Sequence, residues 1–211
     1  VSLALTDADQ ALVLNLVSIN LRASGRLMEA LEPTRAAVQE MVKLENWTMA
    51  AQNAINLSEL ELTLGEVDKA VEEAAQSVTY ADRDGELFRR MTSRTAYADA
   101  LHHNGRAAEA QIQFQVAQEL QKELNPEYSH FHSYRNFRYC ELLLGTVARS
   151  AWQCALRDKR KEISDHPTHS ETLRLVLERA AYSLEIDERN NWIFDVSLDH
   201  LTMSRTLLYA A

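Results

Sequence analysis

The residues most able to do chemistry in this chain are histidines grouped at short spacing. His166 and His169 stand with Asp165 in an expected loop, and three such side chains could hold Zn²⁺, although no fourth ligand is evident. His130 and His132 are two positions apart at the start of an expected helix, where they do not share a face. We therefore predict no metal or other cofactor. A metal-dependent enzyme using the His166/His169 loop is an alternative interpretation.

Other catalytic patterns are missing from the sequence. It contains no Ser/His/Asp set with recognisable spacing, no nucleophile elbow and no phosphate-binding loop of the G-x-x-x-x-G-K-[ST] kind. Cys140 and Cys154 have neither CxxC nor zinc spacing, which favours a reduced, cytoplasmic setting. They lie on either side of an expected turn, so a disulfide between them stays open. We predict that the chain is not an enzyme.

Charge and hydropathy exclude two classes of partner. The 211 residues include 31 Asp and Glu but 22 Lys and Arg, giving a net charge of −9. Nucleic-acid binding depends on neutralising phosphates with basic side chains, so this balance disfavours it. No run of about 18 consecutive apolar residues predicts a membrane span.

The elements that position these residues follow from a repeat. Four of the five glycines, Gly25, Gly65, Gly105 and Gly145, are 40 residues apart. A fixed period of this size indicates a stacked array of helix pairs. Each glycine is expected to end a helix, because it adopts a positive φ at low cost. Small residues recur five positions later, at Ala30, Ala70, Ala110 and Ser150.

The period predicts one domain over 1–211 with about ten helices. Its repeats are about 6–44, 45–85, 86–127 and 128–163, followed by divergent helices over 164–211 in a truncated array. The expected helices are about 6–24, 27–44, 47–64, 67–81, 87–103, 107–124, 129–144, 147–161, 170–186 and 192–209. The first helix has two apolar faces, both expected to be buried, formed by Leu12, Leu14, Leu16, Val17, Ile19 and Leu21.

The third repeat carries the clearest family pattern. Ala98-Asp99-Ala100-Leu101, then Gly105-Arg106-Ala107-Ala108-Glu109-Ala110, then Phe114, Ala117 and Pro126 resemble the tetratricopeptide repeat (TPR). The first two repeats place small residues at the same positions, whereas the fourth has Arg138 and Arg157 there. The resemblance implies an all-α, right-handed superhelical solenoid of antiparallel helix hairpins.

The length of the period narrows the resemblance. The 40-residue period resembles that of the arrays in large bacterial signalling ATPases of the STAND class. So does one segment near the C-terminus, Ser197-Leu198-Asp199-His200-Leu201-Thr202. In such proteins the array follows a nucleotide-binding switch domain. The resemblance implies a sensor or scaffold segment of a larger cytoplasmic bacterial signalling protein.

The resemblance also implies where a partner binds. In this family the first helix of each hairpin lines the concave face, with inward positions 13, 10, 6 and 3 residues before each glycine. A protein or peptide is the implied partner. The predicted groove residues are Asn15, Arg22, Gln52, Glu59, Asp99, His102, Arg135 and Tyr139, interleaved with Leu12, Ile19, Ile55, Leu62, Thr92, Thr95, His132 and Leu142.

The last expected helix is too apolar to stand uncovered. Exposed apolar stripes of this size usually mark interfaces. We expect either a second copy of the chain or crystal neighbours to cover it, and a second copy would form a homodimer through the C-terminal helix. A structural homo-oligomerisation module is therefore a further alternative function. The stripe comprises Trp192, Ile193, Val196, Leu201, Leu207 and Leu208.

Overall fold

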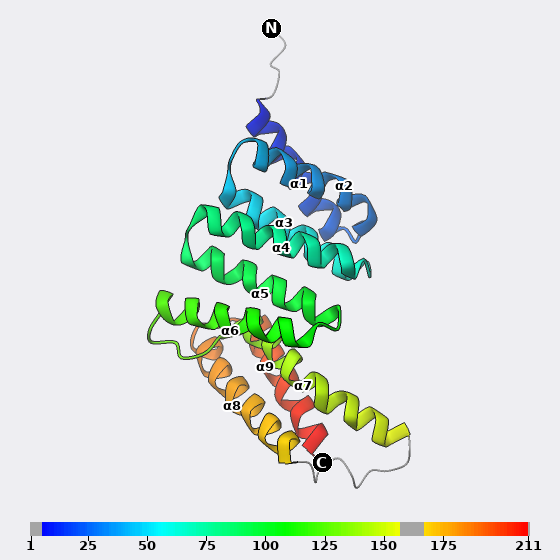
Figure 1. Cartoon of the computed structure of the whole chain (residues 1–211), viewed down its shortest axis with the longest axis vertical. Coiled ribbons are helices and arrows are strands. Elements are labelled where there is room, and N and C mark those ends of the chain that lie inside the picture. Colours follow the sequence, from blue (N-terminus) through cyan, green and yellow to red (C-terminus); the bar gives the residue numbers. More distant parts are fainter. Residues whose placement is uncertain (1–5, 157–166, 211) are drawn as a thin grey trace. The chain divides into compact units, whose positions relative to one another are not determined.

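A computed structural model describes residues 6–156 and 167–210, and within these ranges the chain is helical with no strand. The all-α prediction is confirmed for this part of the chain. Nine helices occur there, against the ten expected (Figure 1). They are α1 (Asp7–Ala23), α2 (Leu27–Lys43), α3 (Trp47–Thr63), α4 (Val67–Asp84), α5 (Leu87–His103), α6 (Ala107–Leu124), α7 (Ser133–Leu156), α8 (Pro167–Arg189) and α9 (Ile193–Ala210).

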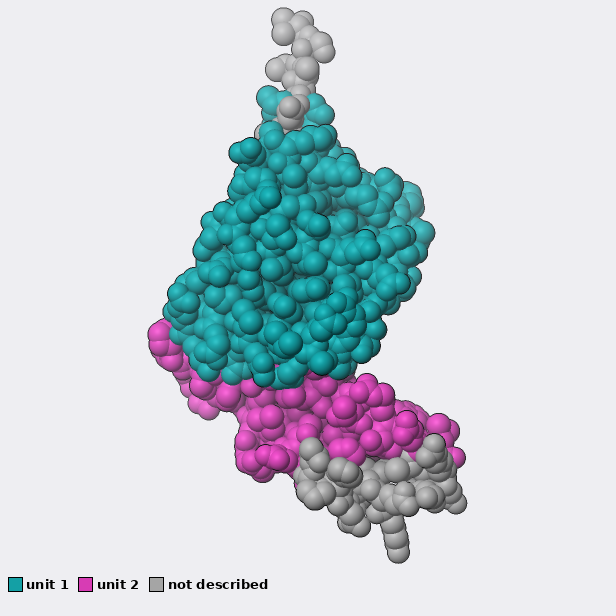
Figure 2. Space-filling view, in the orientation of Figure 1, with its two compact units in different colours: residues 1–124 teal, residues 125–211 magenta. Residues whose placement is uncertain are grey.

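The chain divides into two compact units, residues 1–124 and 125–211 (Figure 2). Unit 1 contains α1 to α6, and unit 2 contains α7 to α9. The division falls close to the expected boundary between the third and fourth repeats.

Unit 1 is a stack of three helix hairpins. α1 pairs with α2, α3 with α4 and α5 with α6, and successive hairpins meet through α2 against α3 and α4 against α5 (Figure 1). At Gly25 and Gly105, φ is 72° and 81°. The backbone N–H groups that follow these glycines, from Arg26 and Arg106, each reach the carbonyl oxygen five residues earlier at 2.9 Å. These helix ends need a left-handed residue, as the glycine period predicted.

Small side chains let the helices of each hairpin approach closely. The Ser58 hydroxyl donates to the carbonyl oxygen of Ala70 at 2.8 Å, joining α3 to α4. The equivalent hairpin of α5 and α6 meets at Ala98 and Ala110, both fully buried. The small-residue columns of the sequence therefore mark buried positions in all three hairpins.

The predicted break at Gly145 is wrong. α7 runs through this glycine as one helix, replacing the expected pair 129–144 and 147–161. Gly145 does not have the positive φ that Gly25 and Gly105 have. A glycine inside a helix costs about 1 kcal/mol relative to alanine, which burial of the flanking Leu144 and Val147 can offset.

The sequence just after each glycine separates the true turns from this one. In unit 1, the second helix of each hairpin begins with an ion pair between two side chains three positions apart in the sequence. After Gly145 the corresponding residues are Thr146 and Arg149, which cannot form such a pair. The three pairs are Arg26–Glu29, Glu66–Lys69 and Arg106–Glu109.

The helices of unit 2 differ from the predicted bounds. α8 begins at Pro167, a residue suited to the first helical position, rather than at 170. It continues through the expected polar break to Arg189. The chain then turns at Asn191, whose φ is 56°. α7, α8 and α9 pack on one another around a shared apolar core, which contains Cys140, Leu144, Val147, Leu173 and Val176.

None of the described helices is both long and apolar enough to cross a lipid bilayer.

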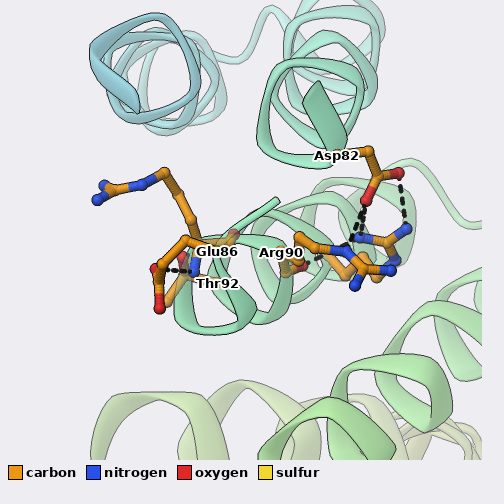
Figure 3. A network of polar contacts seen from close by, with 6 residues as sticks. Asp82, Glu86, Arg90 and Thr92 are labelled. Carbon is orange, nitrogen blue, oxygen red and sulfur yellow. Dashed lines mark hydrogen bonds and ion pairs between the residues drawn. The ribbon is translucent and has the colours of Figure 1, made fainter. Parts of the chain in front are cut away.

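A charge cluster joins the second hairpin to the third. Asp82, near the end of α4, accepts hydrogen bonds from Arg94 at 2.8 and 3.0 Å and from Arg90 at 3.0 Å (Figure 3). Burial alone would raise the pKa of Asp82, but the hydrogen bonds from Arg94 and Arg90 outweigh it and hold this pKa below its ordinary value. The side chain of Glu86 caps α5, accepting from two backbone N–H groups (Figure 3).

Replacing Ala110 by leucine should destabilise unit 1 by about 1–3 kcal/mol, because added methylenes overpack the close contact between α5 and α6. Ala108→Leu, at an exposed position on the same helix, is the matched control. Chemical denaturation followed by circular dichroism would measure both variants. Equal stability of the two would contradict the proposed close approach.

Acid should weaken the contact between α4 and α5. A carboxyl whose pKa is lowered on folding stabilises fully above its unfolded value, near 3.8, and this contribution is lost as the pH falls. Asp82 is partly exposed, so Asp82→Asn should cost only about 0.2–1 kcal/mol at neutral pH. The difference between wild type and Asp82→Asn should shrink towards pH 3 in denaturant titrations. A difference that does not change with pH would argue against the ion pairs.

Candidate binding surface

Six of the eight predicted groove residues lie on the first helices of the three hairpins in unit 1. α3 packs against α5 in addition to α2 and α4, so the first helices of the second and third hairpins are neighbours. α1 is linked to α3 through an ion pair. We call the surface formed by the predicted positions of α1, α3 and α5 the first-helix face. Its predicted polar members are Asn15 and Arg22 of α1, Gln52 and Glu59 of α3, and Asp99 and His102 of α5.

Arg22 and Glu59 come together although they are far apart in the sequence. The Arg22 Nη2 and Glu59 Oε2 atoms are 3.7 Å apart, and each side chain is 30 % exposed. This pair connects α1 to α3 across the first-helix face. Partly exposed pairs of this kind contribute little to stability. Gln52 is exposed on the same helix as Glu59.

The α5 part of the face is more closed than predicted. Asp99 is only 7 % exposed, and its carbonyl oxygen lies 2.9 Å from the Nδ1 atom of His103. Thr95 is also buried, and its hydroxyl donates to the carbonyl oxygen of Met91. His102 is half-buried, with its ring edge-on to His103. Among the predicted polar residues of α5, His102 is thus better placed than Asp99 to meet a partner.

The apolar residues of α1 are the largest departure from prediction. Two buried faces were expected, but α1 packs mainly against α2, and much of its apolar surface is exposed. Val13, Leu16 and Val17 had not been assigned to the groove. Periodicity alone could not separate exposed from buried apolar positions. The exposed fractions are 53 % for Leu12, 45 % for Val13, 49 % for Leu16, 40 % for Val17 and 47 % for Ile19.

The other two predicted groove residues, Arg135 and Tyr139, belong to unit 2. Tyr139 is 8 % exposed, with the Arg179 guanidinium 4.4 Å from its ring centroid and Phe131 edge-on. Arg135 is half-buried, and burial lowers the pKa of its guanidinium against the opposing effect of Asp195. Both side chains therefore pack among α7, α8 and α9. The first-helix face is formed by α1, α3 and α5 without them.

The histidines singled out by the sequence have structural contacts. His130 lies 3.2 Å from Arg179 and edge-on to Tyr182. His132 is stacked against Trp192, and burial, followed by the nearby Arg135, lowers its pKa. Over residues 6–156 and 167–210, no three His, Cys, Asp or Glu side chains group in a way that could hold a metal. His169 lies in α8, while Asp165 and His166 fall outside the described residues.

Cys140 is a buried thiol in the core of unit 2. Burial raises its pKa to about 12, so the side chain is a protonated, unreactive thiol at neutral pH. Because Cys140 is a free thiol, no disulfide joins it to Cys154, whose side chain lies outside the described part of the chain.

A scan against protein-family models, a search of curated proteins and a search of solved structures each found no match to this chain.

Proposed function

We propose that the chain is a non-catalytic binding module of the TPR type, which holds a protein or peptide partner on the first-helix face. α1, α3 and α5 begin 40 residues apart, at Asp7, Trp47 and Leu87, in agreement with the glycine period. Buried small residues at equivalent positions support the same repeat. A right-handed solenoid is the architecture that the resemblance to the TPR family implies.

The observation that carries this proposal is the exposed apolar surface of α1 beside the Arg22–Glu59 pair. Exposed apolar patches next to partly exposed charges are typical of interaction sites. Leu12 and Ile19 occupy predicted inward positions and are about half exposed. A partner with apolar anchors and flanking charges would cover the anchors of α1 and exchange ion pairs with Arg22 and Glu59.

The wider role that we propose is a sensor or scaffold segment of a larger cytoplasmic bacterial signalling protein. The support is the resemblance of the 40-residue period and of residues 197–202 to the arrays of STAND-class ATPases. The net charge of −9 favours a protein partner over nucleic acid.

A second candidate function, homodimerisation, is favoured by the outer face of α9. Phe194, Leu201 and Leu208 repeat every seven residues and are 69, 46 and 71 % exposed. The exposed positions of α9 between Ile193 and Leu208 include no Asp, Glu, Lys or Arg. A neutral stripe is the surface through which two copies of an acidic chain can meet with least repulsion.

Peptides selected from a displayed random library against the full chain should bind the first-helix face. Ile19→Lys should weaken their binding about tenfold or more, because it places a charge among the apolar anchors. Met28→Lys is the control, since Met28 is an exposed apolar residue on the second helix of the same hairpin. Isothermal calorimetry would measure the affinities. Equal losses in both variants, or none in Ile19→Lys, would contradict the proposal.

Light scattering on the full chain should detect dimers at micromolar concentration. Phe194→Glu combined with Leu201→Glu should yield monomers, because two negative charges enter the apolar stripe of α9. Ile112→Glu, at an exposed apolar position on α6, should leave the dimer intact. A wild-type chain that stays monomeric over this range would rule out the α9 dimer.

A further inference from the structure

Unit 2 contains a pair of acidic side chains in its interior. Asp187 near the end of α8 is fully buried, and Asp199 in the middle of α9 is 1 % exposed. A buried carboxylate is costly unless a cation or several hydrogen bonds compensate its charge. The sequence analysis did not single out either residue, because acidic residues are common throughout this chain.

Hydrogen bonds tie Asp187 to two helices. The Ser133 hydroxyl at the start of α7 donates to Asp187 Oδ1 at 2.7 Å. The Ser183 hydroxyl, one turn earlier on α8, donates to Asp187 Oδ2 at 3.2 Å. The Ser133 backbone N–H in turn donates to the Ser183 hydroxyl at 2.9 Å. Asp187 therefore accepts a hydrogen bond at each of its oxygens.

Asp199 is compensated differently. Burial is the main cause that raises the pKa of Asp199 to about 8, and the Ser183 hydroxyl opposes it. The hydrogen bond and negative charge of Asp187, followed by the charge of Asp195, raise this pKa further. The Oδ2 atom of Asp199 is buried without a hydrogen-bond partner. Among the described residues, the groups that most influence the pKa of Asp199 are Ser183, Asp187 and Asp195, with no Arg or Lys. One proton held between the two carboxyls removes their mutual repulsion.

The charged groups around the pair do not replace that proton. Arg135 of α7 attracts Asp187 and Asp195 rather than Asp199. His132 lies 3.9 Å from Asp187, and its lowered pKa keeps it neutral at pH 7. Asp195, one turn before Asp199 on α9, adds further negative charge. The titratable groups that influence Asp199 or Asp187 are His132, Arg135, Cys140 and Asp195.

We propose that Asp187 and Asp199 form a proton-dependent latch, which holds α9 against α8 and α7 only while the two carboxyls share a proton. Loss of the proton leaves two negative charges facing each other in the interior. α9 must then move or admit water to separate them. The latch gives unit 2 a response to rising pH, separate from partner binding by unit 1.

The direction of the pH effect follows from the raised pKa. In the unfolded chain the pKa of Asp199 has its ordinary value near 3.8, so the carboxyl has lost its proton well below pH 7. In the folded chain Asp199 still keeps that proton. Between about pH 4 and 8 folding therefore takes up a proton, so opening of α9 becomes easier as the pH rises. The opening equilibrium constant should grow about tenfold per pH unit in this range and level off above pH 8.

Amide hydrogen exchange in α9 of the full chain tests the latch between pH 6 and 9, after correction for the intrinsic pH dependence of exchange. Asp199→Asn mimics the protonated carboxyl, so the pH-dependent opening of α9 should be strongly reduced. Glu185→Gln, which removes an exposed acid from α8, should keep the wild-type response. The same pH dependence in Asp199→Asn as in wild type would overturn the proposal.

A direct titration covers the case in which Asp199→Asn does not fold. Carbon-13 NMR of the aspartate carboxyls in the wild-type chain should show one group titrating near pH 8. Asp187→Asn should move that midpoint to lower pH, because a neighbouring negative charge is removed. A midpoint near 4 for Asp199 in the folded wild type would rule out the latch.

Discussion

Close approach of helices through small side chains is the constraint on which unit 1 depends. Where α3 meets α4, Ser58 donates directly to the backbone of Ala70, a contact that a larger side chain at position 70 would block. Between α1 and α2 a contact between two side chains takes this place, with the hydroxyl oxygens of Ser18 and Thr34 2.5 Å apart. Hairpins joined in this way bury their apolar faces on each other and on the next hairpin.

Unit 2 achieves its packing by another route. Its interior holds polar and charged groups, and each needs a compensating contact. Asn136 donates to the carbonyl oxygen of Arg179, and the Arg179 guanidinium lies over the ring of Tyr139. Asp187 and Asp199 belong to this buried polar set, so the packing of unit 2 is sensitive to their protonation.

The two units therefore offer different properties. Unit 1 presents partly exposed apolar and charged side chains on a framework of regular hairpins, which suits it to hold a partner. Unit 2 couples the position of a helix to the protonation of buried carboxyls. Binding and pH response need not share residues, since the two sets of side chains belong to different units.

The sequence alone determined the helical content, the first three hairpins and the positions of their turns. These features are local: a glycine with positive φ, an ion pair in the next turn and small residues at fixed spacing act within about one hairpin. The repeat in the sequence also predicted that Arg22 and Glu59 lie on one surface. The glycine at 145 shows the limit, because its helical conformation depends on what covers Leu144 and Val147. Only the tertiary structure decided the burial of Tyr139, the exposure of α1 and the meeting of Asp187 with Asp199. Burial depends on neighbours distant in sequence, and the same residue types occur on both exposed and buried faces.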